Sequence, residues 1–209
     1  MARLAIIGAS GHGKVVADIA LSSGKWQEIT FFDDAYPNIK KVECWDVLGT
    51  TDYLIENALE FDGIIVAIGD NKIRLAIFKK LEHKECGNII TLIHRDATVC
   101  SSVKIGAGTV VMAGAIVNAF SSLGKGCIIN SNSVVEHDCV LSDGVHISPG
   151  AILTGAVSID SCSWVGAGAI VIQQLKIGSN ITIGAGSCVI NDIADEGVYA
   201  GSPARKLTG

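Results

Sequence analysis

Residues 93–194 decide the fold when they are written in sixes: IHRDAT VCSSVK IGAGTV VMAGAI VNAFSS LGKGCI INSNSV VEHDCV LSDGVH ISPGAI LTGAVS IDSCSW VGAGAI VIQQLK IGSNIT IGAGSC VINDIA. All seventeen hexads begin with Ile, Val or Leu, and no insertion interrupts them. The fifth place is mostly small, and only Leu175, Ile181 and Ile193 are large there. A period of six matches neither a 3.6-residue helix nor an alternating strand.

This period predicts a coil that turns a corner every six residues, so that three short flat faces make one 18-residue coil. The leading aliphatic side chain is expected to point into a narrow core, and the small fifth residue to fit a tight corner. Coils should stack ~4.8 Å apart through strand hydrogen bonds. The pattern resembles the hexapeptide-repeat left-handed parallel β-helix, here with roughly five and a half coils and no inserted loop.

The chain has a different pattern before residue 90. Apolar stretches typical of buried strands cover 4–8, 28–34 and 61–71, and they alternate with helix-like stretches at 13–24, 49–58 and 71–83. Alternating strands and helices predict an α/β, Rossmann-like small parallel sheet. We therefore expect two domains, residues 1–90 and 91–209.

Composition excludes several classes of protein. The net charge of −5 and an aromatic content of 5% argue against nucleic-acid binding, which needs basic patches and stacking rings. No signal peptide and no 18-residue apolar stretch are visible, so no membrane association is expected. The seven cysteines are scattered without a CxxC pair, which favours reduced thiols in the cytoplasm over a zinc framework.

A glycine-rich turn, GASGHGK at 8–14, joins the first expected strand to the first expected helix. Its glycines, Gly8, Gly11 and Gly13, depart from the GxGxxG dinucleotide pattern but would let backbone N–H groups approach a phosphate. Asp33 and Asp34 end the second strand, and Gly69 follows the third, so all these segments meet at the carboxyl edge of the sheet. A nucleotide site and a purely structural turn with helix caps both remain open on this pattern.

Two histidines lie nine residues apart in VEHDCV and LSDGVH, His137 and His146. Nine residues is half a coil, which places them on opposite sides of the prism, so one chain cannot bring them to one ion or one substrate atom. Two copies side by side can, which predicts a site between subunits. For His137 and its neighbour Asp138, the alternatives are an idle surface pair, a metal ligand, or a general base oriented by a carboxylate.

Both halves together resemble the bacterial sugar O-/N-acyltransferase family related to sialic acid O-acetyltransferases, and in particular its nucleotide-aminosugar N-acetyltransferases. The matching segments are GASGHG, FFDD, AIGDN, INSNSVVEHDCVLSDGVHISPGA and VYAGSPARK. The resemblance implies a homotrimer with intersubunit sites, acetyl-CoA as co-substrate, a nucleotide-activated amino sugar as acceptor, a role in polysaccharide biosynthesis, and no metal.

The resemblance also implies roles for individual residues. His137 matches the general base and Asp138 the acid that raises its basicity. Expected acetyl-CoA contacts are His146, Ala167 and Ala185. Expected contacts to the nucleotide sugar are Ser10, Gly11, His12, Asp33, Asp34, Gly69 and Asn130.

The implied reaction is direct transfer without a covalent enzyme intermediate, because Cys127 and Cys139 occupy fifth places of the repeat and should be buried. Two alternatives remain open from sequence: O-acetylation of a sugar such as sialic acid, and a non-catalytic scaffold that binds nucleotide sugars.

Overall fold

The computed structural model describes residues 1–86 and 88–208; Gly87 and Gly209 lie outside the described residues. The chain forms two compact units, Met1–Arg95 and Asp96–Gly209. Within the described ranges no helix is both long and apolar enough to cross a membrane.

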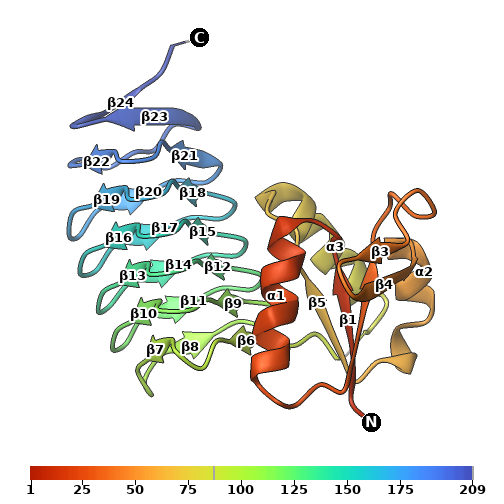
Figure 1. Ribbon diagram of the computed structural model, residues 1–209. Coiled ribbons are helices and arrows are strands. Elements are labelled where there is room, and N and C mark those ends of the chain that lie inside the picture. The colour runs from red at the N-terminus through yellow and green to blue at the C-terminus, as the bar shows by residue number, and fades with distance from the viewer. Residues whose placement is uncertain (87, 209) are drawn as a thin grey trace. The chain divides into compact units, whose positions relative to one another are not determined.

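The first unit is a five-stranded sheet with helices on both faces (Figure 1). Its sheet order is β3-β4-β2-β1-β5, in which only the β3–β4 pair is antiparallel. The elements run in chain order as β1 Arg3–Ile7, α1 Gly11–Ser22, β2 Glu28–Phe32, β3 Lys41–Val42, β4 Trp45–Gly49, α2 Thr51–Glu56, a 3₁₀ turn at Ala58–Glu60, β5 Gly63–Val66 and α3 Asn71–His83.

The Rossmann-like expectation is confirmed for β1, β2 and β5 and for the three helices, whereas β3 and β4, at one end of the sheet, were not predicted. β4 alternates between exposed and buried residues, with Val47 buried and Leu48 half exposed, so it lacks the continuous apolar stretch of a central strand. The caps follow the sequence: Thr50 Oγ1 accepts from the Tyr53 N–H, and Asp70 Oδ1 accepts from the Ile73 N–H.

The second unit is a parallel β-helix whose strands, most of them two residues long, stack into three faces (Figure 1). The first face contains β7 Thr98–Val99, β10 Ile116–Val117, β13 Val134–Val135, β16 Ile152–Leu153, β19 Ile170–Val171 and β22 Cys188–Val189. The second face contains β8 Lys104–Ile105, β11 Ser122–Leu123, β14 Val140–Leu141, β17 Ser158–Ile159 and β20 Lys176–Ile177. The third face contains β9 Val110–Val111, β12 Ile128–Ile129, β15 His146–Ile147, β18 Trp164–Val165, β21 Ile181–Ile183, β23 Gly197–Gly201 and β24 Ala204–Lys206, while β6 Leu92–Ile93 falls within the first unit.

The hexad register is reproduced residue for residue, since each strand pairs with the strand 18 residues away, as in Ile116↔Val134 and Ile128↔His146. The strands occupy the sixth and first places, and the leading aliphatic residues from Val111 to Val189 form one buried core. This is the left-handed β-helix class expected from the repeat.

The corner of each coil lies one residue earlier in the hexad than expected. The turn residues are the third and fourth places, and every fourth-place residue from Gly108 to Gly186 has a left-handed φ. Glycine, asparagine and aspartate occupy most of these places because they tolerate that conformation best. The fifth residue follows the turn and points inward, as Ala115, Cys127 and Ser133 do with 0% exposure.

Candidate functional site

His137 and Asp138 form a hydrogen-bonded pair on the corner between β13 and β14. His137 Nδ1 lies 2.8 Å from Asp138 Oδ2, and both side chains are more than half exposed in the single chain. Asp138 sits at the fourth place with φ 59°, the left-handed conformation that turns its carboxylate back beside the preceding ring. Neighbouring coils hold the backbone: the Asp138 N–H donates to Ala119 O and the Ala156 N–H donates to His137 O.

The contact with Asp138 fixes the tautomer of the His137 imidazole as well as the position of its ring. An ionised carboxylate can only accept hydrogen bonds, so the ring nitrogen facing Asp138 is the one that carries hydrogen. The lone pair of a neutral His137 then lies on Nε2, on the side away from the carboxylate. A neutral imidazole held this way can remove a proton from a bound group, and the carboxylate stabilises the imidazolium that forms.

His146 lies on a different part of the coil, on β15 of the third face, and only 8% of it is exposed. Its ring stacks on Trp164, one coil further on, with centroids 5.3 Å apart and planes 5° apart. Its Nε2 lies 3.2 Å from Asn130 Nδ2. The Trp164 indole N–H donates to Ser148 Oγ at 2.5 Å, so the stacked pair is anchored at both ends.

A pocket of about 450 Å³ opens beside this pair, along the third face and the corner that leads to the first face. Its lining combines all three predicted cofactor residues with apolar neighbours: His146, Ser148, Pro149, Trp164, Gly166, Ala167, Thr182, Ile183, Gly184 and Ala185. Trp164 was not predicted as a site residue. The sequence signal that could have identified it is an aromatic residue at the outward-facing sixth place, 18 residues after His146.

His137 does not line this pocket. It lies on the corner between the first and second faces, whereas the pocket adjoins the corner between the third and first faces. The first face therefore has the base candidate along one edge and the pocket along the other. Among the described residues no cluster of three His, Cys, Asp or Glu side chains is arranged to hold a metal ion.

The glycines at the carboxyl edge of the first sheet, which are those of the 8–14 turn and Gly69, are of two kinds. A Cβ on Gly8 would lie 2.7 Å from Ala67 O, and one on Gly13 would lie 2.1 Å from Gly8 O, so close packing explains both. A Cβ on Gly11 or Gly69 would meet no atom within 4 Å, so the backbones of these two residues face open space. Gly11 begins α1, where free N–H groups favour an anion.

The two aspartates after β2 are committed to the loops around them. Asp33 Oδ2 accepts from the Ala9 N–H at 2.7 Å and its Oδ1 accepts from the Ala35 N–H at 2.9 Å. Asp34 Oδ1 accepts from the Thr51 N–H at 2.9 Å, at the start of α2. Asp33 thus joins the glycine turn to the end of β2, next to Ser10, which precedes α1 as its N-cap residue.

His12 and Arg74 make the same edge of the sheet chemically unusual. Arg74 is 1% exposed and donates to the backbone oxygens of Ile68 and Gly69 at 2.8 and 3.0 Å. Burial, with a further contribution from the Arg74 charge, lowers the pKa of His12 to about 4. His12 is therefore neutral near pH 7, and its Nε2 is buried without a hydrogen-bond partner. Arg74 was not predicted, because in the sequence it looks like one more polar residue on an amphipathic helix.

Two of the seven cysteines, Cys127 and Cys139, are core residues, as expected. Cys127 and Cys139 are fully buried, and burial raises the pKa of the Cys139 thiol, whose Sγ lies 3.3 Å from Thr154 O. Neither thiol is placed to attack a bound substrate.

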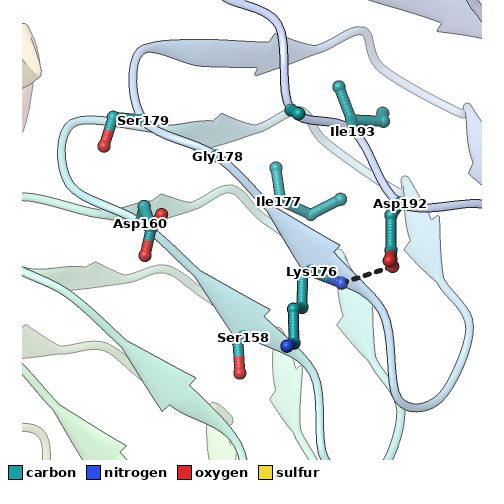
Figure 2. Close-up of a pocket in the computed structure, with 9 residues that line it drawn as sticks. Ser158, Asp160, Lys176, Ile177, Gly178, Ser179, Asp192 and Ile193 are labelled. Carbon is teal, nitrogen blue, oxygen red and sulfur yellow. Dashed lines mark hydrogen bonds between the residues drawn. The ribbon is translucent and has the colours of Figure 1, made fainter.

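A second pocket, of about 440 Å³, lies over the last coils and contains none of the predicted site residues (Figure 2). Lys176 and two acids, Asp160 and Asp192, supply its charged groups, and the Lys176 N–H donates to Asp192 Oδ1 at 2.8 Å. One carboxylate thus helps to close the end of the repeat by capping the backbone of β20.

Both units resemble known proteins. Residues 3–81 match the PglD N-terminal domain family. UDP-N-acetylbacillosamine N-acetyltransferase of Bacillus subtilis is 39% identical over 118 residues, which are 54% of this chain and 52% of that protein. The chain thus spans about half the length of this curated relative.

Two solved structures match nearly from end to end. The acetyltransferase domain of PglB from Neisseria gonorrhoeae, in complex with acetyl coenzyme A, is 45% identical with a TM-score of 0.92, covering 98% of each chain. A mutant of perosamine N-acetyltransferase from Caulobacter crescentus, in complex with CoA and GDP-perosamine, is 32% identical with a TM-score of 0.93, covering 100% of this chain and 98% of the other. The chain therefore belongs to the family of bacterial hexapeptide-repeat sugar acetyltransferases that includes the PglB acetyltransferase domain and perosamine N-acetyltransferase.

Proposed function

We propose that this protein transfers the acetyl group of acetyl-CoA to the 4-amino group of a nucleotide-linked amino-deoxy sugar. The observation that carries the proposal is the His137–Asp138 pair, an exposed imidazole oriented by a carboxylate at 2.8 Å. The relatives supply the reaction class, since their names and bound molecules are those of sugar N-acetyltransferases with acetyl-CoA or CoA.

In the proposed reaction His137 Nε2 takes a proton from the sugar amine as its nitrogen attacks the thioester carbonyl. The negative charge on the tetrahedral oxygen is held by backbone N–H donors. The C–S bond then breaks, the amide C–N bond is complete, and the thiolate of CoA takes the proton from the imidazolium. Asp138 keeps the ring in the required tautomer throughout. The buried thiols of Cys127 and Cys139 support transfer without an acyl-cysteine.

Acetyl-CoA is proposed to lie in the pocket beside His146. The lining is mostly apolar and includes Gly166, Ala167 and Ala185, which suits the extended, alternately apolar and amide-bearing arm of the cofactor. The flat stack of His146 on Trp164 forms one wall.

The nucleotide sugar is proposed to bind the carboxyl edge of the first sheet, which corresponds to a nucleotide-sugar domain at 1–90 and an acyltransferase domain at 91–209. The open backbone at Gly11 and Gly69 leaves room for the phosphates. Ser10, Asp33, Asp34 and His12 are proposed to contact the ligand at this edge. Because His12 is neutral, it would contribute a hydrogen bond to the ligand and no charge.

We further propose a homotrimer with sites between subunits. The outward residues of the first face form an apolar ladder from Ile116 through Val134, Ile152 and Ile170 to Cys188. The outward row of the second face is mostly polar, with one apolar residue, Val140, among Lys104, Ser122, Ser158 and Lys176. If the ladder faces the symmetry axis, cyclic symmetry brings one edge of this face against the opposite edge of the next copy. His137 of one subunit then meets the His146 pocket of its neighbour.

Thiol release from acetyl-CoA tests the function, with UDP-, dTDP- and GDP-linked 4-amino sugars and free sialic acid as acceptors. Release with amino sugars alone supports the proposal and identifies the nucleotide. Release with sialic acid indicates an O-acetyltransferase, and no release with any acceptor indicates a binding scaffold. A fully active monomer in sedimentation would rule out the intersubunit site.

The seven free cysteines fit a reducing compartment, and we propose that the enzyme works in the cytoplasm and serves polysaccharide biosynthesis.

A further inference from the structure

Gly155 is exceptional in the repeat because it is the one glycine at the third place of the seventeen hexads. Every other third place carries a side chain, and alanine is the commonest: Ala107, Ala113, Ala119, Ala167 and Ala185. The backbone of Gly155 does not need glycine, since its φ is outside the left-handed region. Something other than the turn must explain the missing Cβ.

The explanation lies one coil earlier on the same corner. A Cβ on Gly155 would lie 2.6 Å from His137 Nε2 and 2.7 Å from its Cε1. Real Cβ atoms do not approach other heavy atoms this closely, so a methyl group and the observed ring cannot coexist. The clash falls on the ring nitrogen that faces away from Asp138, the atom assigned above to proton transfer.

We propose that Gly155 is a positioning residue for the acetyl-transfer reaction, its missing side chain leaving the space in which the His137 ring sits and from which Nε2 meets the acceptor amine. This rests on the proposed function of His137. Asp138 holds one side of the ring by a hydrogen bond, and Gly155 defines the other side by the absence of atoms. Since the ring is exposed at the end of a flexible side chain, an added methyl group is expected to displace the ring and leave the coil intact.

The test is Gly155→Ala, with Ala156→Gly as matched control because it alters the same turn without adding atoms near the ring. Gly155→Ala should lower kcat by about 10-fold or more, up to the roughly 10²–10⁴-fold loss expected when a general base is removed. Its affinity for CoA and its melting temperature should match those of the parent protein. In a His137→Ala background, Gly155→Ala should cause no further loss, because the ring it displaces is gone. Ala156→Gly should retain the parent rate.

A second measurement separates this inference from the proposed function. The imidazole C–H resonance of His137, identified by its disappearance in His137→Ala, should move in Gly155→Ala and stay in place in Ala156→Gly. Parent activity together with an unmoved resonance in Gly155→Ala would overturn the positioning role. A parent protein without acetyl transfer to any acceptor would refute the proposed function, and the resonance would then decide whether Gly155 sets the position of the ring.

Discussion

The hydroxyl of Ser121 hydrogen-bonds to the backbone on both sides of the turn that carries the proposed base. Its removal gives a testable prediction, for which Ser163 supplies a matched control. Ser121 is 1% exposed; its Oγ donates to Glu136 O at 2.7 Å and accepts from the Cys139 N–H at 3.1 Å. These two backbone groups bracket His137 and Asp138. Ser163 makes the same pair of bonds elsewhere in the repeat, to Gly178 O at 2.6 Å and from the Ile181 N–H at 2.9 Å, and is also buried.

Replacing either serine by alanine deletes two hydrogen bonds and leaves a carbonyl and an N–H in the closed interior. At about 1–2 kcal/mol for each group, we expect both variants to lose about 3 kcal/mol of unfolding free energy. For a chain of this length, that lowers the melting temperature by about 6–12 °C. The two variants should differ in catalysis: Ser121→Ala loosens the His137 turn and should lower kcat by about 10-fold, while Ser163→Ala should keep the parent kcat.

The assays are a thermal melt and steady-state thiol release, the latter at a temperature well below the melting temperature of the weaker variant. A melting temperature of Ser121→Ala equal to that of the parent would refute the stabilising role of these two hydrogen bonds. An equal loss of kcat in Ser163→Ala would show that the rate follows overall stability and that the His137 turn has no special dependence on Ser121.

Three further predictions concern the base, the pocket and the buried histidine. Asp138→Asn keeps the side-chain size but removes the charge beside His137, so kcat/KM should fall by about 10–100-fold with thermal stability unchanged. Trp164→Ala removes the stacked wall of the pocket and should weaken CoA binding by about 10-fold in a calorimetric titration, while exposed Leu59→Ala should have no effect. The lowered pKa of His12 means that the unfolded chain binds a proton between about pH 6.5 and 4 that the folded chain excludes. Stability should therefore fall as the pH drops through this range, by about 2 kcal/mol between pH 7 and pH 5 in urea unfolding; His12→Asn should flatten this dependence, and an unchanged slope would contradict a buried neutral ring.

The repeat made the second unit predictable in detail because its periodicity is local and uninterrupted. Counting in sixes identifies the inward residue of each strand, the 18-residue spacing of neighbours and the placement of His137 and His146 on different sides of the coil. The same count also pairs His146 with Trp164 and His137 with Gly155, two contacts that were not predicted. The predicted position of the corner was wrong, because small fifth-place residues fit a tight turn and a narrow core equally well.

The first unit was less predictable because its edge and its polar contacts are not periodic. In β3, which has two residues, and in β4, exposed residues alternate with buried ones, so both resemble a loop in sequence. The acids after β2 were expected to bind a ligand, and they also cap backbone N–H groups in the loops around them.

The sequence by itself determined the coil, its register and its core, because one aliphatic side chain every six residues leaves the backbone a single economical way to bury them all. The tertiary structure decided what the polar groups do. A left-handed turn brings Asp138 onto His137, a missing Cβ one coil away leaves the ring its space, and burial beside Arg74 keeps His12 neutral. These outcomes depend on distances between segments far apart in the chain, and a local pattern of residue types does not contain those distances.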